Sequence, residues 1–310
     1  MTKQTISDLY HQPLLSLIDQ AHQMHKANFG SDIELCKLIS VKTGGCPEDC
    51  GYCSQSTKFD TKVKMNALLP VEEVERQAIE AKAHGVKRIC MGAGYKSPNS
   101  SALAKACEYI KVIKKHGLET CATLGSLSLE QANQLKDAGL DYYNHNIDTS
   151  PEYYPSVVTT RTFQDRIDTI DHVGQTGMKV CCGGIIGMGE TIEDRISFIH
   201  ALTALPYTPD SIPVNTQVKI EGTPLAHTDK LDKLELVRTI ATVRILFPKT
   251  RVRLSAGRSE LSEAEQTLCF MAGANSIFYG DELLTTPNND QHEDLQLLAK
   301  LGINTHVDVA

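Results

Sequence analysis

Three closely spaced cysteines form a loop that could bind an iron–sulfur cluster. Residues Gly44–Cys53 read GGCPEDCGYC, so Cys46, Cys50 and Cys53 follow a C-x3-C-x2-C spacing. Because a [4Fe–4S] cluster usually has four cysteine ligands, three cysteines leave one iron with an open position. S-adenosylmethionine (SAM) could chelate that iron through its amino and carboxylate groups. An electron passed into the sulfonium would then break a C–S bond and release a 5′-deoxyadenosyl radical.

A zinc knuckle is the alternative for this loop. Zinc would need a fourth ligand to complete a tetrahedron. The loop contains no histidine, and the nearest one upstream, His25, falls inside a predicted helix. The spacing is also unusual for zinc, whereas Tyr52 offers an aromatic side chain that could cover the cluster or an adenine. We therefore expect a SAM-binding [4Fe–4S] cluster.

A second motif lies at the end of a predicted strand. The segment 183–190 reads GGIIGMGE and contains G-x-I-x-G-x-x-E, formed by Gly183, Ile185, Gly187 and Glu190. It resembles the segment that lines the adenine site in radical SAM proteins. A glycine-rich turn from strand to helix is common in α/β proteins, so this motif alone is weak evidence. Together with the cysteine loop it supports a SAM site.

Short β-rich runs alternate with amphipathic helical patterns along the chain, which indicates βα units and a parallel sheet. The predicted strands are 34–42, 86–91, 119–123, 141–148, 179–186, 212–220, 251–255 and 275–279. The main predicted helices are 71–83, 102–115, 129–138, 161–175, 192–205 and 234–246. Eight strands predict a (β/α)8 TIM-type barrel, although one sequence leaves an open doubly wound sheet possible. With no linker, we expect one domain over 1–310, with a core at about 34–280, an N-terminal helix at about 14–28 and a helical tail at about 291–310.

Strand periodicity brings a second set of cysteines together. Cys90, Cys121 and Cys181 fall in three different predicted strands, whose alternate residues point to the barrel axis. Arg253 should also point inward, because Val252 and Leu254 supply the apolar face toward the helices. A buried arginine needs an anionic partner, which a thiolate-bound cluster would provide. Ordinary buried cysteines are an equally good interpretation of the spacing alone.

The remaining cysteines are predicted to be structural. Cys36, Cys107 and Cys269 are expected to be ordinary buried thiols, and Cys182 should point away from Cys181 toward the helices. Two polar rows also occupy single strand faces: Asn144, Asn146 and Asp148, and Asn215, Gln217 and Lys219. Such rows need hydrogen-bond partners, which ribose hydroxyls or the N–H and C=O groups of a urea could supply. Polar packing inside the barrel, with buried water, is the alternative.

Composition indicates which kinds of partner and which cellular compartment to expect. The 310 residues are 41% hydrophobic and 22% charged, with a net charge of −7 that argues against nucleic acid or an anionic membrane as main partner. The N-terminal segment lacks the features of a secretory signal, and no apolar run approaches the length of a membrane span. We expect a cytoplasmic protein, where thiolate ligation is a better use of ten cysteines than disulfides.

From about Leu14 to Leu301 the chain resembles the biotin synthase family of radical SAM enzymes. The stretches that carry the resemblance are KTGGCPEDC at 42–50, DYYNHNIDTS at 141–150, VRLSAGR at 252–258 and MAGANSIFYG at 271–280. Cys182 departs from the family pattern, which has serine there.

The resemblance implies a homodimeric barrel with two clusters. Cys46, Cys50 and Cys53 match the ligands of the SAM-binding [4Fe–4S] cluster. The four ligands of an interior [2Fe–2S] cluster are matched by Cys90, Cys121, Cys181 and Arg253. Asn146 and Asp148 match positions near SAM and the substrate. Arg166 matches a residue that contacts the SAM carboxylate, and Asn215 matches one that contacts the substrate. Asn144 is also expected to contact the substrate, because it shares a strand face with Asn146 and Asp148.

The activity implied is the last step of biotin biosynthesis. Dethiobiotin would gain sulfur at two unactivated carbons, from which the deoxyadenosyl radical removes hydrogen atoms and to which the interior cluster donates a bridging sulfide. Side chains acting as acids or bases cannot do this, so no such catalytic residue is expected. An external one-electron donor of the flavodoxin or ferredoxin type is required. The alternatives to this activity are that of another radical SAM barrel, such as a hydrogenase maturase, and a non-catalytic iron–sulfur carrier.

Overall fold

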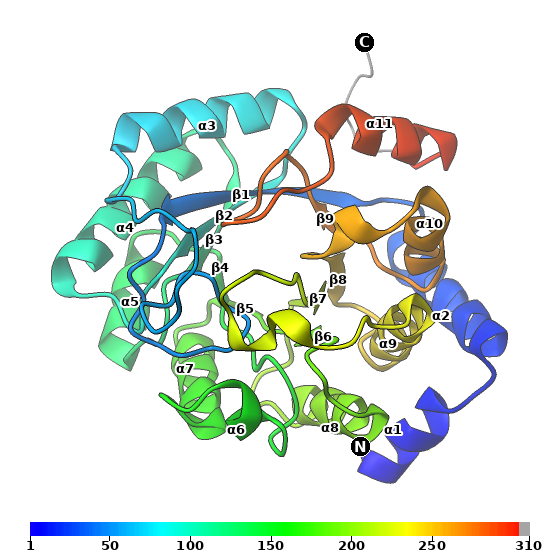
Figure 1. The fold of residues 1–310 in the computed structure, drawn as a ribbon. Helices are drawn as coiled ribbons and strands as arrows, with labels where there is room; N and C mark the ends of the chain where they lie inside the picture. The colour runs from blue at the N-terminus through cyan, green and yellow to red at the C-terminus, as the bar shows by residue number, and fades with distance from the viewer. Residues whose placement is uncertain (304–310) are drawn as a thin grey trace.

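A closed parallel barrel surrounded by helices makes up residues 1–303, which are the residues that the computed structural model describes (Figure 1). The strands are β1 Glu34–Lys42, β2 Arg88–Ala93, β3 Glu119–Thr123, β4 Tyr142–Asn144, β5 Lys179–Cys181, β6 Gly184–Ile186, β7 Ser211–Thr216, β8 Arg251–Leu254 and β9 Ser276–Phe278. The helices are α1 Lys3–Tyr10, α2 Leu14–Phe29, α3 Val71–Ala83, α4 Ser100–Lys115, α5 Leu129–Asp137, α6 Tyr154–Val157, α7 Phe163–Gln175, α8 Ile192–Thr203, α9 Lys233–Leu246, α10 Glu263–Met271 and α11 Gln291–Lys300, with short 3₁₀ turns η1 Pro224–His227 and η2 Arg258–Glu260.

Strand pairing closes the sheet on itself. The order β5-β4-β3-β2-β1-β9-β8-β7-β6 is completed by pairing of β5 with β7, and every ladder is parallel. The predicted (β/α)8 TIM-type barrel is therefore confirmed, and the open sheet is excluded. The seven predicted C-terminal residues of the helical tail, 304–310, lie outside the described residues.

Several predicted strands are shorter than expected, and the one predicted at 212–220 ends at Thr216. The strand predicted at 179–186 is divided into β5 and β6, because Gly183 passes so close to β7 that an added Cβ would lie 2.0 Å from the Pro213 carbonyl oxygen. The strand predicted at 141–148 ends at Asn144. Beyond it the chain turns, and Asp148 is the one non-glycine residue of 1–303 with a positive φ, 66°.

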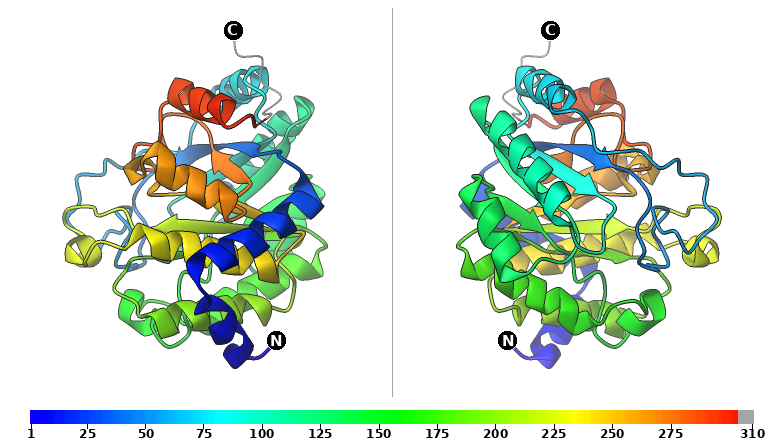
Figure 2. Two further views of the ribbon diagram at one scale, coloured as in Figure 1. Left: turned by 90° about the vertical axis from the view of Figure 1, so that its right-hand side faces the viewer. Right: turned by 90° about the vertical axis from the view of Figure 1, so that its left-hand side faces the viewer.

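Local sequence sets the helix boundaries. Serine or threonine residues begin α5, α7, α8 and α10 with complete capping boxes, and each box satisfies otherwise unpaired N–H groups. Gly139 and Gly273 both have φ of 100° and separate a helix from the next strand, as the sequence predicts. Helix α1, which the sequence pattern does not predict, packs against α8, while α2 packs against α9 (Figure 2).

An ion network fills the amino-terminal end of the barrel. Arg88 is buried beneath the Tyr142 ring, 3.5 Å from its centroid, and pairs with Glu34 at 3.3 Å and Glu119 at 2.9 Å. These side chains therefore close the amino-terminal end of the barrel. The carboxyl ends of the strands carry the longer loops, where active sites of such barrels lie.

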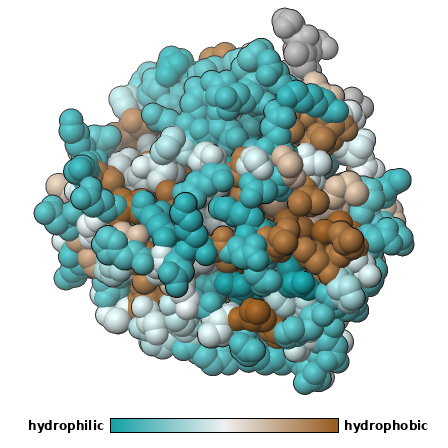
Figure 3. Space-filling view, turned by 45° about the vertical axis from the view of Figure 1, so that its right-hand side comes forward, coloured by the Kyte–Doolittle hydropathy of each residue, from teal (hydrophilic) through white to brown (hydrophobic). Residues whose placement is uncertain are grey.

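The surface seen in Figure 3 is mostly hydrophilic, with hydrophobic side chains gathered in interrupted patches. Within residues 1–303, the helices are all too short or too polar to cross a membrane.

Candidate active site

The loop after β1 folds around its three cysteines. Gly44 and Gly45 have φ of 74° and 71°, and a backbone bridge joins Cys46 to Ser56. The amide of Cys53 donates to the Cys50 carbonyl at 2.8 Å. These bonds bend the chain so that the three thiols share one loop at the carboxyl end of the barrel.

Two acidic side chains fix this loop to the segment before α7. Glu48 is buried and accepts a hydrogen bond from Arg161 Nε at 2.8 Å. Asp49 accepts from the amides of Thr159 and Thr160 at 2.9 and 3.1 Å. Since both carboxylates lie between cysteines in the sequence, they hold the loop without occupying its interior face.

Burial keeps the loop thiols protonated. It raises the pKa of Cys50 to about 12 and that of Cys53 to about 11, and it raises the pKa of Cys46 as well. Iron must therefore displace protons as it binds, and its positive charge compensates the buried thiolates. The soft sulfur donors, and the lack of a histidine in the loop, fit an iron–sulfur cluster.

A buried ionic group lies beside the cysteine loop. Tyr52 donates to Asp148 Oδ2 at 3.0 Å, and Arg166 forms a short ion pair with the same oxygen. Arg166 Nε also donates to the Tyr154 hydroxyl at 2.9 Å. These contacts bring together Tyr52 from the loop, Asp148 from the turn after β4 and Arg166 from α7. All three were expected to lie at the SAM site.

The glycine-rich motif has a different arrangement. Glu190 turns back and accepts from the amides of Gly187 and Met188 at 2.8 and 2.7 Å, and from Arg195 Nε at 2.8 Å. Its carboxylate therefore shapes the turn after β6, while Ile185 lines the cavity. Through these contacts Glu190 holds the turn in position.

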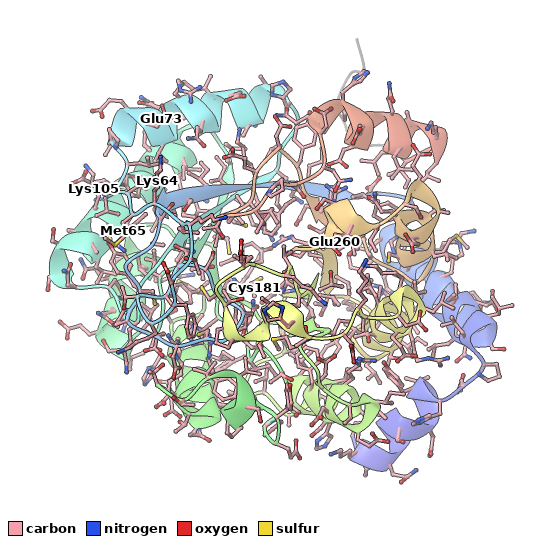
Figure 4. The ribbon with its side chains drawn as sticks, in the orientation of Figure 1. Lys64, Met65, Glu73, Lys105, Cys181 and Glu260 are labelled. Atoms are coloured by element: carbon pink, nitrogen blue, oxygen red, sulfur yellow. The ribbon has the colours of Figure 1, made fainter. Side chains whose placement is uncertain are left out.

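The interior cysteines lie on adjacent barrel positions. Cys90 and Cys121 are register partners on β2 and β3, and Cys121 contacts Cys181 of β5. Figure 4 shows Cys181 at the centre of the barrel, while Glu73 and Lys105 lie on the outer helices. Arg253 of β8 is 2% exposed and faces the same interior.

These thiols form a row rather than a cage for one ion. Within residues 1–303, no three His, Cys, Asp or Glu side chains are arranged to hold a single metal ion. A [2Fe–2S] cluster has two irons that each need their own ligands, and a row of thiols fits that need. Interaction with the neighbouring Cys121 thiol lowers the pKa of Cys90 and of Cys181.

Three asparagines lie between the two cysteine sets. Asn144 donates to Thr123 at 2.9 Å, while its carbonyl oxygen is buried without a partner among the described residues. Asn146 accepts from the Gly183 amide at 3.1 Å. Asn215 donates to the Gly184 carbonyl and accepts from the Ala256 amide. The NH₂ group and the carbonyl oxygen of its side chain are thus both hydrogen-bonded to the backbone.

One cavity of about 260 Å³ connects these groups. Its wall includes Tyr52 and Cys53 from the loop and Cys90, Cys121 and Arg253 from the barrel interior. The residues between them include Asn144, Asn146, Asp148 and Asn215. The residues expected at the site that do not line this cavity include Cys181, Arg166, Gly183, Gly187 and Glu190. A small ligand in this cavity would reach both cysteine sets.

Sequence reasoning missed two contributors to the site. The hairpin at Leu283–Thr286 covers the cavity, and Thr285 joins it to Ser54 of the cysteine loop at 2.9 Å. Cys36, expected to be an ordinary buried thiol, lies beside Cys90 and Arg253. Its alternation with Leu35 on β1 is the signal that could have found it. By contrast, Cys182 and Cys269 pack in the core between strands and helices, and Cys107 is half-buried.

The barrel and its cysteine loop define a radical SAM enzyme. The model of the Radical SAM superfamily matches residues 40–202, and that of the Biotin and Thiamin Synthesis associated domain matches residues 213–304. Enzymes of this class use a [4Fe–4S] cluster with SAM. Among solved structures, methylornithine synthase has a TM-score of 0.83 at 21% identity, covering 98% of this chain and 93% of that one. The hydrogenase maturase of Carboxydothermus hydrogenoformans has 0.84 at 16%, covering 98% and 75%. At these identities the likeness shows the fold alone.

The chain belongs to the biotin synthase family. It is 51% identical to the biotin synthase of Ralstonia pickettii, over 99% of this chain and 86% of the relative. It is 55% identical to that of Janthinobacterium sp. (96% and 88%) and 52% identical to that of Acinetobacter baumannii strain ATCC 17978 (97% and 92%). The family resemblance of the sequence is thereby confirmed, and the interpretation as a hydrogenase maturase has no comparable support.

Proposed function

We propose that this enzyme converts dethiobiotin to biotin by inserting sulfur at two unactivated carbons. The observation that carries the proposal is the single cavity, which has Cys53 in one part of its wall and Cys90, Cys121 and Arg253 in another. A substrate held between them would lie within reach of a radical source and a sulfur source. When bound, the two clusters and SAM supply the electron, the hydrogen-abstracting radical and the sulfur.

Cys46, Cys50 and Cys53 would hold the SAM-binding [4Fe–4S] cluster. The interior [2Fe–2S] site would be surrounded by Cys90, Cys121, Cys181 and Arg253, the set that the family resemblance implies. In support, all of these side chains except that of Cys53 are buried. Burial keeps bulk solvent away from the clusters and limits side reactions of a reactive intermediate.

The polar wall would orient SAM and dethiobiotin. Tyr52, Asp148 and Arg166 form one charged group beside the cysteine loop, which suits the ribose hydroxyls and carboxylate of SAM. Asn146, Ile185 and the turn at Gly183, Gly187 and Glu190 would bound the adenosine. The partnerless carbonyl oxygen of Asn144 would accept from a urea N–H of dethiobiotin, with Asn146 and Asn215 beside it.

The proposed oligomeric state, compartment and electron donor follow from the family resemblance. We propose a cytoplasmic homodimer that receives electrons from a flavodoxin- or ferredoxin-type donor and has neither nucleic acid nor membrane as partner. The whole of 1–310 would act as one radical SAM barrel domain.

The test is anaerobic reconstitution with iron and sulfide, followed by metal and labile-sulfide analysis. We expect about six irons per chain, four and two for the two cluster types, and no zinc. A chain that takes up zinc and no labile sulfide would contradict the proposal and leave a zinc-stabilised binding protein. Clusters without deoxyadenosine release from SAM would instead favour an iron–sulfur carrier.

A further inference from the structure

A polar network joins helix α1 to the turn after β6. Tyr10, the last residue of α1, donates its hydroxyl proton to Glu235 Oε2 of α9 at 2.9 Å. The same oxygen accepts from Arg195 Nη1 of α8 at 3.1 Å, and Arg195 Nε donates to Glu190 Oε1 at 2.8 Å. These four side chains form the α1–β6 network, which connects three helices to one turn.

Most of this network is shielded from solvent. Tyr10 is 1% exposed, and the side chains of Arg195 and Glu190 are 10% and 1% exposed. Burial raises the pKa of the Tyr10 hydroxyl well above its ordinary value, so the hydroxyl keeps its proton and donates to Glu235. Hydrogen bonds to charged groups in such surroundings are stronger than those in water.

Arg195 is shared between two carboxylates. Its planar guanidinium carries N–H donors in a fixed fork, so its orientation is set by Glu190 at Nε and by Glu235 at Nη1 together. Among residues 1–303, it is also the only cation paired with Glu190. A change at Glu235 therefore alters how Arg195 holds Glu190.

Helix α1 is anchored at the start of the network. Arg238 Nη1 donates to the carbonyls of Tyr10 and Gln12 at 2.6 and 2.8 Å, which fixes the chain where α1 ends. Ile6 has no exposed surface, and the helix packs against α8 and α9. The Tyr10 hydroxyl reaches Glu235 only when α1 is docked in this way.

The other end of the network is the turn itself. Gly187 and Gly189 have φ of 88° and 99°, and glycine leaves the backbone free to adopt other conformations. Glu190 holds one of them by accepting from the amides of Gly187 and Met188 at 2.8 and 2.7 Å. Ile185, two residues before Gly187, lines the cavity. The position of Glu190 therefore sets the edge of the cavity at this turn.

We propose that Tyr10, Glu235 and Arg195 are positioning residues for SAM. Through the α1–β6 network, docking of helix α1 fixes the turn after β6 and with it the affinity for SAM. None of these three residues lines the cavity, so they act through Glu190. The inference rests on the proposed function, which places the adenosine of SAM against this turn.

The first test is the SAM dissociation constant of the reconstituted full-length enzyme, measured by calorimetry for Tyr10→Phe. Loss of this hydroxyl should raise the constant about threefold, as remote couplings of this kind do, while kcat at saturating SAM stays unchanged. Tyr109→Phe is the matched control, because Tyr109 is also fully buried and donates to the Leu69 carbonyl. Circular dichroism checks that both variants are folded. Equal SAM affinity in Tyr10→Phe and Tyr109→Phe would overturn the inference.

A double-mutant cycle distinguishes coupling from a general loss of stability. Glu235→Gln removes the charge that Arg195 meets at α9 and should raise the dissociation constant about fivefold. In the Glu190→Gln enzyme the network is already broken, so adding Glu235→Gln should change SAM binding by less than about twofold. Effects that multiply in the double variant would show that Glu235 acts independently of Glu190, and would overturn the inference alone. If the unsubstituted enzyme binds no SAM, the proposed function fails, and the inference fails with it.

Discussion

Tyr52 and Asp148 join the cysteine loop to the polar wall of the cavity through a hydrogen bond of 3.0 Å. Tyr52 stands between Cys50 and Cys53 in the sequence, whereas Asp148 ends a turn after β4 in which it adopts a positive φ. A backbone in that conformation is held by its surroundings, and strain of this kind gathers at functional sites. The bond couples the position of the proposed SAM-binding cluster to that of the carboxylate.

Tyr52→Phe should weaken SAM binding by about tenfold, because a hydrogen bond to a charged group contributes about 1.5 kcal/mol. Asp148 keeps its ion pair with Arg166, so the fold and the iron content should be unchanged. The measurement is the SAM dissociation constant of the reconstituted enzyme by calorimetry. Tyr207→Phe, at an exposed tyrosine outside the cavity, is the matched control. Equal SAM affinity in Tyr52→Phe and the control would show that the bond has no part in the SAM site.

Cys50→Ala and Cys121→Ala should separate the two proposed clusters. Cys50→Ala should abolish deoxyadenosine release, since the SAM-binding cluster loses a ligand. Cys121→Ala should retain part of that release yet form no biotin, because the interior sulfur source is lost. Both products can be quantified by mass spectrometry in the same reaction, with iron analysis alongside. Biotin output from Cys121→Ala equal to that of the unsubstituted enzyme would refute its assigned role.

Glu190→Gln should raise the KM for SAM while kcat changes little. The carboxylate accepts from the amides of Gly187 and Met188, and an amide NH₂ group in its place would face a backbone donor. It also pairs with Arg195, so a loss of about 2 kcal/mol in the free energy of unfolding is expected. Urea denaturation and initial rates measure the two effects.

Glu193→Gln, on the exposed side of α8, is the control for Glu190→Gln and should change neither quantity. A Glu190→Gln enzyme that loses stability and keeps its KM for SAM would assign the residue to folding alone.

His25 should make stability depend on pH. Burial lowers the pKa of His25 to about 4, and the nearby Arg244 guanidinium acts in the same direction. In the unfolded chain the pKa is near 6.5, so the unfolded state binds the extra proton first as the pH falls. The free energy of unfolding should therefore decrease by about 2 kcal/mol between pH 6.5 and 4.

His25→Gln should flatten this part of the pH profile, because no group at that position titrates, whereas His292→Gln, at an exposed histidine of α11, should leave the profile unchanged. Chemical denaturation of the metal-free protein at several pH values measures it. A profile that is equally steep with and without His25 would place the effect elsewhere.

Periodicity predicted the barrel because its strands have different inner and outer faces. In β8, Val252 and Leu254 face the helices and Arg253 faces inward, as alternation requires. The division of β5 from β6 was not predictable, since it follows from a close contact between Gly183 and Pro213, which are distant in sequence. The end of β4 likewise depends on the conformation of Asp148.

Spacing identified the cysteine loop, because its three cysteines are local in sequence. Tyr52 was found with the loop and Asp148 on a polar strand face, whereas Arg166 came only from the family resemblance. Their grouping was not predictable from the pattern, since no periodicity relates a loop, a strand end and a helix. Cys36 shows the opposite case. Its strand was predicted with the bounds that the structure has, and alternation would have turned it inward, but proximity to Arg253 exists only once the barrel closes between β8, β9 and β1.

The central claim is that one cavity brings radical generation and sulfur delivery to the same substrate. Anaerobic incubation with dethiobiotin, SAM and a one-electron reductant, followed by mass spectrometry, tests it most directly. The account predicts that biotin and 5′-deoxyadenosine form together, with two deoxyadenosines for each biotin because two carbons lose hydrogen. Deoxyadenosine without any biotin, from protein shown to contain both clusters, would contradict it.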